Sequence, residues 1–296
     1  MRSFAIFLGL IALGFAGIAL LGYPAWLLAA PLLDNPKFSR IASRVAMLIL
    51  VVGFLFVARR LKVADRNSLG FALPAAQFAR EAAIAVVLGA LLMLPVVAAM
   101  LLFDLRALKP GVVLDAAEFA KLAMFGLATG LVVGLSEETF LRGAMQTAIT
   151  RESGVAPAII LTSLVYAATH FVAGKFRVAP ADVDFGSGLD MLAVVLKTFA
   201  HPLGILDSFL CLAAVGVLLG MVRAATGNIA GCVGLHAGWV AVIYVVRETT
   251  ARNTGSPGAW LMGDYDGFIG WLVLAWTLVI GGVLWWWYGK RKAAPA

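Results

Sequence analysis

The residues of this sequence whose types and spacing could do chemistry are two adjacent glutamates, an arginine and two histidines, all within apolar stretches. The first group reads Ser136-Glu137-Glu138-Thr139-Phe140-Leu141-Arg142-Gly143 and follows a long apolar run. A charge inside a membrane-spanning helix is costly, so an ionisable residue in such a place is a functional candidate by default. The chemistry expected of these residues is hydrolysis, in which a carboxylate activates water.

Helical geometry separates the roles of the two glutamates. Glu138 and Arg142 are four residues apart, so they share a helix face and can form an ion pair. Glu137 points about 100° away and has no local cation. We therefore expect Glu138 to brace the helix and Glu137 to do the chemistry. The alternative is that all three residues extend to the membrane interface at a helix end.

The histidines follow in two later apolar runs. His170 lies one turn after Tyr166, and His236 lies among the small residues of Gly231–Gly238, which let neighbouring helices approach closely. If Arg151–Gly154 is the tip of a helical hairpin, Glu137 lies about 22 Å before the tip and His170 about 24 Å after it, at 1.5 Å per residue. One glutamate and two histidines are therefore expected to converge in the membrane interior.

Two hydrolytic mechanisms fit this set. Glu137, His170 and His236 could bind zinc with an open position for water, whose pKa the metal would lower to about 7. Alternatively, Glu137 could act as a general base without a metal, while the histidines orient it or stabilise an oxyanion. The sequence contains no HExxH motif and no GxSxG motif. His201 precedes Pro202 and is expected in an interfacial loop.

The elements that must position these residues are membrane-spanning helices. Of the 296 residues, 62% are hydrophobic and 13% are charged, against about 25% charged in soluble domains. We expect an all-α, polytopic transmembrane bundle of about eight spans. The apolar segments are Ala5–Leu21, Ile41–Val57, Ala82–Phe103, Phe119–Leu135, Val155–Phe171, Leu203–Met221, Ile229–Val246 and Phe268–Trp287.

The chain divides into N-terminal transmembrane helices at 1–117, a catalytic core at 118–247, and a polar loop with a last transmembrane helix at 248–296. The first span is expected to be retained. The segments Lys175–Asp190 and Arg252–Gly267 are predicted as polar loops. Basic residues in the connection 57–78 and at Lys290–Lys292 favour a cytoplasmic location for both. The net charge of +7 fits anionic lipid headgroups, and no basic soluble face suggests nucleic acid as a partner.

Three motifs together resemble the CPBP family of intramembrane proteases, also called the Abi or CAAX-protease family. They are Glu137-Glu138-x-x-x-Arg142, the pair Tyr166-x-x-x-His170, and His236. The resemblance covers 119–246. It implies that Glu137 activates water, that His170 assists, and that His236 binds a metal or the oxyanion.

The resemblance also implies supporting roles for Glu138 and Arg142, with Phe140, Tyr166 and Val240 near them. Tyr166 stands where the family usually has Phe, and Val240 where it often has Asn. The expected function is an intramembrane endopeptidase, a hydrolase whose metalloprotease character and zinc cofactor stay open. Its expected partners are the lipid bilayer and a membrane-associated peptide or protein substrate. The expected location is the plasma (inner) membrane if the source is bacterial. The alternative is a non-catalytic CPBP-like membrane scaffold or binding protein.

Overall fold

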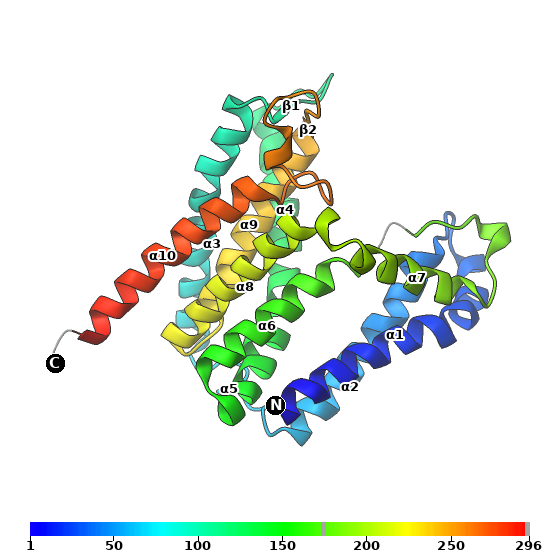
Figure 1. The fold of residues 1–296 in the computed structure, drawn as a ribbon, viewed down its shortest axis with the longest axis horizontal. Coiled ribbons are helices and arrows are strands. Elements are labelled where there is room, and N and C mark those ends of the chain that lie inside the picture. The colour runs from blue at the N-terminus through cyan, green and yellow to red at the C-terminus, as the bar shows by residue number, and fades with distance from the viewer. Residues whose placement is uncertain (173–175, 294–296) are drawn as a thin grey trace.

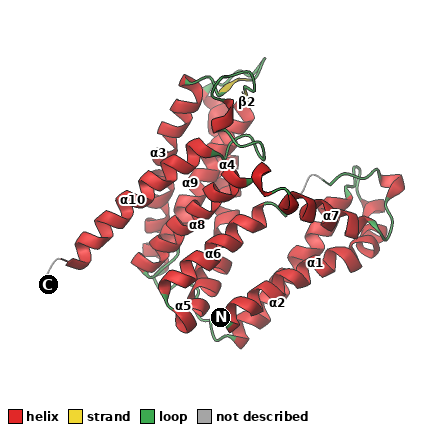
Figure 2. Ribbon diagram, viewed as in Figure 1, coloured by secondary structure: helices red, strands yellow, loops and turns green. Residues whose placement is uncertain are grey.

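The computed structural model describes residues 1–172 and 176–293 and shows a bundle of helices with one very small sheet (Figure 1; Figure 2). The helices are α1 (Arg2–Ala29), α2 (Phe38–Arg60), α3 (Ala75–Leu102), α4 (Ala116–Glu138), α5 (Gln146–Ser153), α6 (Val155–His170), α7 (Ser187–Ala200), α8 (Leu206–Thr226), α9 (Ala230–Thr249) and α10 (Trp271–Ala293). A π-helical segment, Thr139–Met145, joins α4 to α5. Short 3-10 turns are Ala30–Leu32, Pro180–Asp182, Pro202–Gly204 and Ala259–Leu261.

The all-α membrane fold predicted from composition is confirmed. Within the described residues, six helices are long and apolar enough to cross a bilayer, and α6 and α10 are shorter apolar helices. These eight helices coincide with the eight apolar segments of the sequence. Backbone polar groups have no other partner in lipid, which is why each apolar run folds as a helix. The chain is a multi-pass integral membrane protein.

Helix α9 lies between α3 and α4 and touches both through glycines. A Cβ added at Gly130 of α4 would lie 2.7 Å from the carbonyl oxygen of Ala237, and one at Gly234 of α9 would lie 2.2 Å from that of Ala82 on α3. Such close backbone approach is how helices associate in membranes. The packing fixes the rotation of α9 and therefore the direction of His236.

Helices α1 and α2 lie side by side and diverge from the other helices toward the end that carries α7 (Figure 1). Their opposite end is tied to the π-helical segment by aromatic packing. The Phe140 ring lies 5.4 Å from that of Phe7 on α1 and 5.5 Å from that of Phe54 on α2. Phe140 thus connects the N-terminal helices to the motif residues.

Helix α7 and a two-stranded sheet were absent from the sequence prediction. The predicted loop Lys175–Asp190 ends early, because Ser187–Asp190 already form the first turn of α7. Strands β1 (Arg106–Leu108) and β2 (Thr250–Arg252) pair antiparallel. The buried Arg106 of β1 links the two strands, since its Nε donates to the hydroxyl of Thr250 on β2 at 2.7 Å.

The predicted hairpin tip is confirmed. Helix α5 ends at Ser153, and Gly154 has a φ of +87°, which lets α6 begin at once in the opposite direction. Of the residues considered above, Lys175 and the side chains of the C-terminal basic cluster Lys290, Arg291 and Lys292 lie outside the described residues.

Candidate active site

Glu138, the last residue of α4, is fully buried and has two partners. Its Oε1 accepts a hydrogen bond from Nη1 of Arg142 at 3.0 Å, which confirms the ion pair predicted from the spacing. The same oxygen lies 2.9 Å from Nδ1 of His236 on α9. An ionised carboxylate only accepts, so Nδ1 of His236 carries the proton. One oxygen therefore joins an arginine of its own helix to a histidine 98 residues away.

The helix changes its winding directly after Glu138. The amide of Gln146 donates to the carbonyl of Leu141, five residues back, which is the π-helical pattern. Gly143 lies in this segment against the connection between α2 and α3, where a Cβ would come within 2.7 Å of the Leu69 carbonyl oxygen. Short π-helical segments are frequent at functional sites, because they redirect side chains within a continuous helix.

The Arg142 side chain is fully buried and has three kinds of partner. Besides Glu138, its Nη2 donates to the Gly216 carbonyl at 3.2 Å, and its guanidinium carbon lies 4.7 Å from the centre of the Tyr166 ring. A buried cation is tolerated only with such compensation. Arg142 and Tyr166 face each other at nearly equal distances from the hairpin tip, as the predicted register requires.

The Tyr166 ring also contacts the rings of both histidines. Its ring centre lies 4.6 Å from that of His170 and 6.2 Å from that of His236, with both pairs edge-to-face. No hydrogen bond of the Tyr166 hydroxyl occurs among the described residues. Glu138, Arg142, Tyr166, His170 and His236 thus form one group, which we call the motif cluster. The predicted convergence of Glu137, His170 and His236 stays a prediction. The contacts above join the two histidines through Tyr166, and no hydrogen bond or ion pair joins Glu137 to either histidine among the described residues.

His170 is held in one tautomer. Its Nδ1 lies 2.8 Å from the carbonyl oxygen of Tyr166, and a carbonyl can only accept, so Nδ1 carries the proton in the neutral ring. The hydroxyl of Tyr265, from the loop before α10, donates to the carbonyl of His170 at 2.6 Å. Nε2 of His170 therefore carries a lone pair that can accept a proton or a hydrogen bond.

Glu137 is half-buried, and its Oε2 is a buried atom without a hydrogen-bond partner among the described residues. Oε2 of Glu138 and Oε1 of Gln146, on the same stretch of helix, are also buried without a hydrogen-bond partner among the described residues. Unpartnered buried oxygens are places for ordered water. Oε2 of Glu137 is therefore able to accept a hydrogen bond from a water molecule.

The donor types would suit zinc, because each histidine has Nδ1 engaged and Nε2 available for a ligand bond. The positions of Glu137, His170 and His236, however, do not suit a shared zinc ion. Among residues 1–172 and 176–293, no three His, Cys, Asp or Glu side chains are grouped so that they could hold one metal ion. We therefore derive no catalytic step through a metal for Glu137, His170 and His236.

Val240 is oriented toward α4. Its Cβ lies 3.1 Å from where a Cβ at Gly130 would be, two helical turns before Glu137. His201 is exposed at the end of α7 and lies apart from the motif cluster. Gln146, which was not among the predicted site residues, is buried and donates from Nε2 to the Gly220 carbonyl at 3.0 Å. Its spacing of four residues after Arg142 could have revealed it as a third member of the Glu138 face.

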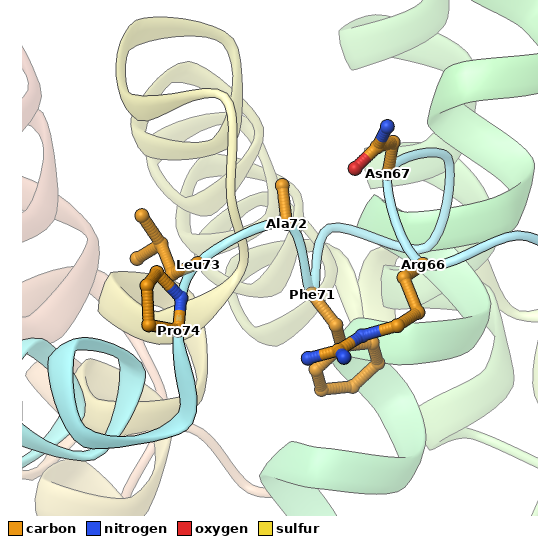
Figure 3. Close-up of a pocket in the computed structure, with 6 residues that line it drawn as sticks. All are labelled: Arg66, Asn67, Phe71, Ala72, Leu73 and Pro74. Atoms are coloured by element: carbon orange, nitrogen blue, oxygen red, sulfur yellow. The ribbon is translucent and has the colours of Figure 1, made fainter.

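One open pocket of about 340 Å³ lies away from the motif cluster, on the connection between α2 and α3 (Figure 3). It is lined by Arg66, Asn67, Phe71, Ala72, Leu73 and Pro74. Arg66 is its single ionisable lining residue, and arginine does not act as a base at neutral pH. This pocket therefore gives no alternative catalytic site.

Residues 119–242 match the family model described as Type II CAAX prenyl endopeptidase Rce1-like. The matched segment contains every residue of the motif cluster, together with Glu137, Phe140 and Val240. No curated protein and no solved structure matches the chain.

Proposed function

We propose that this protein hydrolyses peptide bonds inside the membrane, because residues 119–242 match the Rce1-like CAAX prenyl endopeptidase family model, in agreement with the motif resemblance. At the family level the domain is that of a CAAX-protease-type membrane endopeptidase. The observation that carries the finer proposal is the half-buried Glu137, the residue before Glu138 of the motif cluster, because its Oε2 is buried and has no hydrogen-bond partner among the described residues.

In the proposed reaction Glu137 takes a proton from water as the water oxygen attacks the peptide carbonyl. Nε2 of His170, with its lone pair free, accepts a hydrogen bond from the same water and orients it. The protonated Glu137 then gives its proton to the leaving amine as the C–N bond breaks. The products are a carboxylic acid and an amine, and no other reactant is required.

The oxyanion formed in this step needs hydrogen-bond donors. The Tyr166 hydroxyl, which has no partner among the described residues, is one candidate. Nε2 of His236 is the other in the doubly protonated ring, in which Nδ1 still donates to Glu138. In water-excluded sites such donors contribute about 10²- to 10³-fold in rate. The Tyr166 hydroxyl and Nε2 of His236 would together take the place of the asparagine amide that the resembling family often has at position 240.

The proposed substrate is a membrane-associated peptide or protein with a prenylated CAAX terminus, and nucleic acid is not a partner. The proposed setting is the plasma (inner) membrane, with the site reached from the cytoplasmic side. These proposals rest on the family match and on the intramembrane position of the motif cluster.

The test is cleavage of a prenylated CAAX peptide by the full chain reconstituted in lipid nanodiscs, read by mass spectrometry of the released C-terminal fragment. We expect cleavage by the unmodified protein, and loss of cleavage in Glu137→Gln. The same peptide without the prenyl group measures the requirement for the lipid anchor. If a folded, unmodified protein cleaves neither this peptide nor a peptide library, the non-catalytic scaffold is the better reading.

A further inference from the structure

A second site lies at the end of the bundle where α1 begins and α2 and α5 end. It is a pocket of about 450 Å³ lined by Arg2, Ser3, Arg60, Leu61, Lys62, Ala148, Arg151 and Glu152. We call it the basal pocket. It contains four cations and one carboxylate and shares no residue with the motif cluster.

The single carboxylate of the basal pocket is already engaged. Oε1 of Glu152 accepts from the amide and the hydroxyl of Ser3, at 3.1 and 2.6 Å. Arg151 is also engaged, donating to the Lys62 carbonyl and the Ser68 hydroxyl, each at 2.7 Å. Arg2, Arg60 and Lys62, by contrast, have no ion pair among the described residues. Three positive charges therefore face the pocket without an anion.

The backbone presents Lys62 in an unusual way. Its φ is +55°, in the left-handed region that non-glycine residues seldom adopt. The hydrogen bond from Arg151 to the Lys62 carbonyl fixes this conformation at the end of α2. Strained residues of this kind are retained where the geometry serves a site.

An apolar surface extends from the basal pocket into the membrane. Phe56 and Val52 lie four and eight residues before Arg60, on the same face of α2, and they are 67% and 44% exposed. In a spanning helix these exposed side chains face lipid tails. A ligand seated here would therefore combine an anionic group at Arg60 with a hydrocarbon chain along α2.

We propose that the basal pocket binds the phosphate headgroup of an anionic phospholipid, with an acyl chain on the face of α2 formed by Phe56 and Val52. Basic pockets between spanning helices bind anionic headgroups, and each Lys or Arg near the membrane surface contributes about 1 kcal/mol. Because α5 continues from the π-helical segment, the bound lipid would fix the helix that carries Glu138 and Arg142. This proposal does not depend on the catalytic one.

The experiment measures binding of phosphatidylglycerol to the detergent-purified full chain by native mass spectrometry, with phosphatidylcholine as the zwitterionic comparison. We expect one phosphatidylglycerol to bind preferentially. The double variant Arg60→Gln/Lys62→Gln should bind it about 30-fold more weakly, from about fivefold per charge. The matched control Lys37→Gln/Arg40→Gln removes two exposed charges from the other end of α2 and should bind as the unmodified protein does.

Two further measurements, with inorganic phosphate and with Arg2→Gln, separate a lipid site from other outcomes. Inorganic phosphate in place of lipid should bind far more weakly, and equal binding would overturn the lipid as the ligand. If the double variant does not fold, Arg2→Gln carries the test with an expected loss of about fivefold. Unchanged phosphatidylglycerol affinity in the folded basal variant, or equal affinity for phosphatidylcholine, would overturn the proposal.

Discussion

Nδ1 of His236 lies 2.9 Å from Oε1 of Glu138, the oxygen that also receives the Arg142 hydrogen bond. This contact joins the end of α4 to the middle of α9 across the interior of the bundle. Glu138 therefore stabilises the packing of two helices and also sets the tautomer of a candidate catalytic histidine.

Replacing Glu138 by Gln should destabilise the protein. The change leaves the wholly buried Arg142 without its counter-charge, and breaking a buried pair in this way costs about 3–5 kcal/mol. The measurements are thermal unfolding and yield in a defined detergent. The matched control is Glu118→Gln on the same helix, which breaks the exposed pair with Lys121 and should change stability by less than about 1 kcal/mol. Equal stability of the two variants would contradict the structural role of Glu138.

The Tyr166 hydroxyl can be tested by Tyr166→Phe. The hydroxyl has no hydrogen-bond partner among the described residues, so its loss should leave the melting temperature nearly unchanged. If it donates to the oxyanion, kcat should fall by about 10²-fold while KM stays constant. Tyr265→Phe is the control for a hydroxyl whose bond is structural, and it should cost about 1 kcal/mol in stability. An unaltered kcat in Tyr166→Phe would leave His236 as the proposed donor.

Val240→Asn tests whether the amide common in the resembling family limits the rate. Val240 packs closely against Gly130 of α4, and asparagine has a similar side-chain volume, so the substitution keeps this contact. We expect normal folding and faster peptide cleavage if the native donors are insufficient. Turnover equal to that of the unmodified protein would show that Tyr166 and His236 already supply the hydrogen bonds.

A pH effect is expected at Asp65 in the connection between α2 and α3. The Ser68 hydroxyl donates to this carboxylate and lowers its pKa from the ordinary 3.8, and the Ser68 amide acts in the same direction. A depressed folded-state pKa stabilises the protein above the unfolded value and ceases to do so as pH falls through the folded value. Asp65→Asn should therefore lower the melting temperature at pH 7, and the difference should shrink below about pH 4. A difference independent of pH would rule out this linkage.

The hairpin register was predictable because it depends only on chain length and helical rise. Arg142 and Tyr166 lie at nearly equal distances from the tip at Gly154, and they meet. The partner of His236 was not predictable. The rotation of α9 is set by glycines that contact α3 and α4 on other faces, and those contacts are tertiary.

The π-helical segment also has no clear signal in the sequence. It forms where Gly143 admits the backbone of Leu69 from a distant connection. Helix α7 was missed for a different reason, because its 14 residues are too few to span a bilayer and follow a polar stretch. Sequence patterns thus located the spans, while the geometry between spans required the structure.

Replacing each of the two neighbouring glutamates by Gln should affect different properties, activity for Glu137 and stability for Glu138. Glu137→Gln keeps the shape of the side chain, removes its basicity and leaves the Glu138, Arg142 and His236 contacts intact, so the variant should unfold at the same temperature as the unmodified protein. Its kcat on the prenylated peptide should fall at least 10²-fold, the contribution typical of a general base. Glu138→Gln should instead give little folded protein that keeps some activity per folded molecule. Comparing kcat per folded molecule with the melting temperature separates the two effects. Retained turnover in Glu137→Gln, or a well-folded but inactive Glu138→Gln, would mean that Glu138 is the base and Glu137 its neighbour.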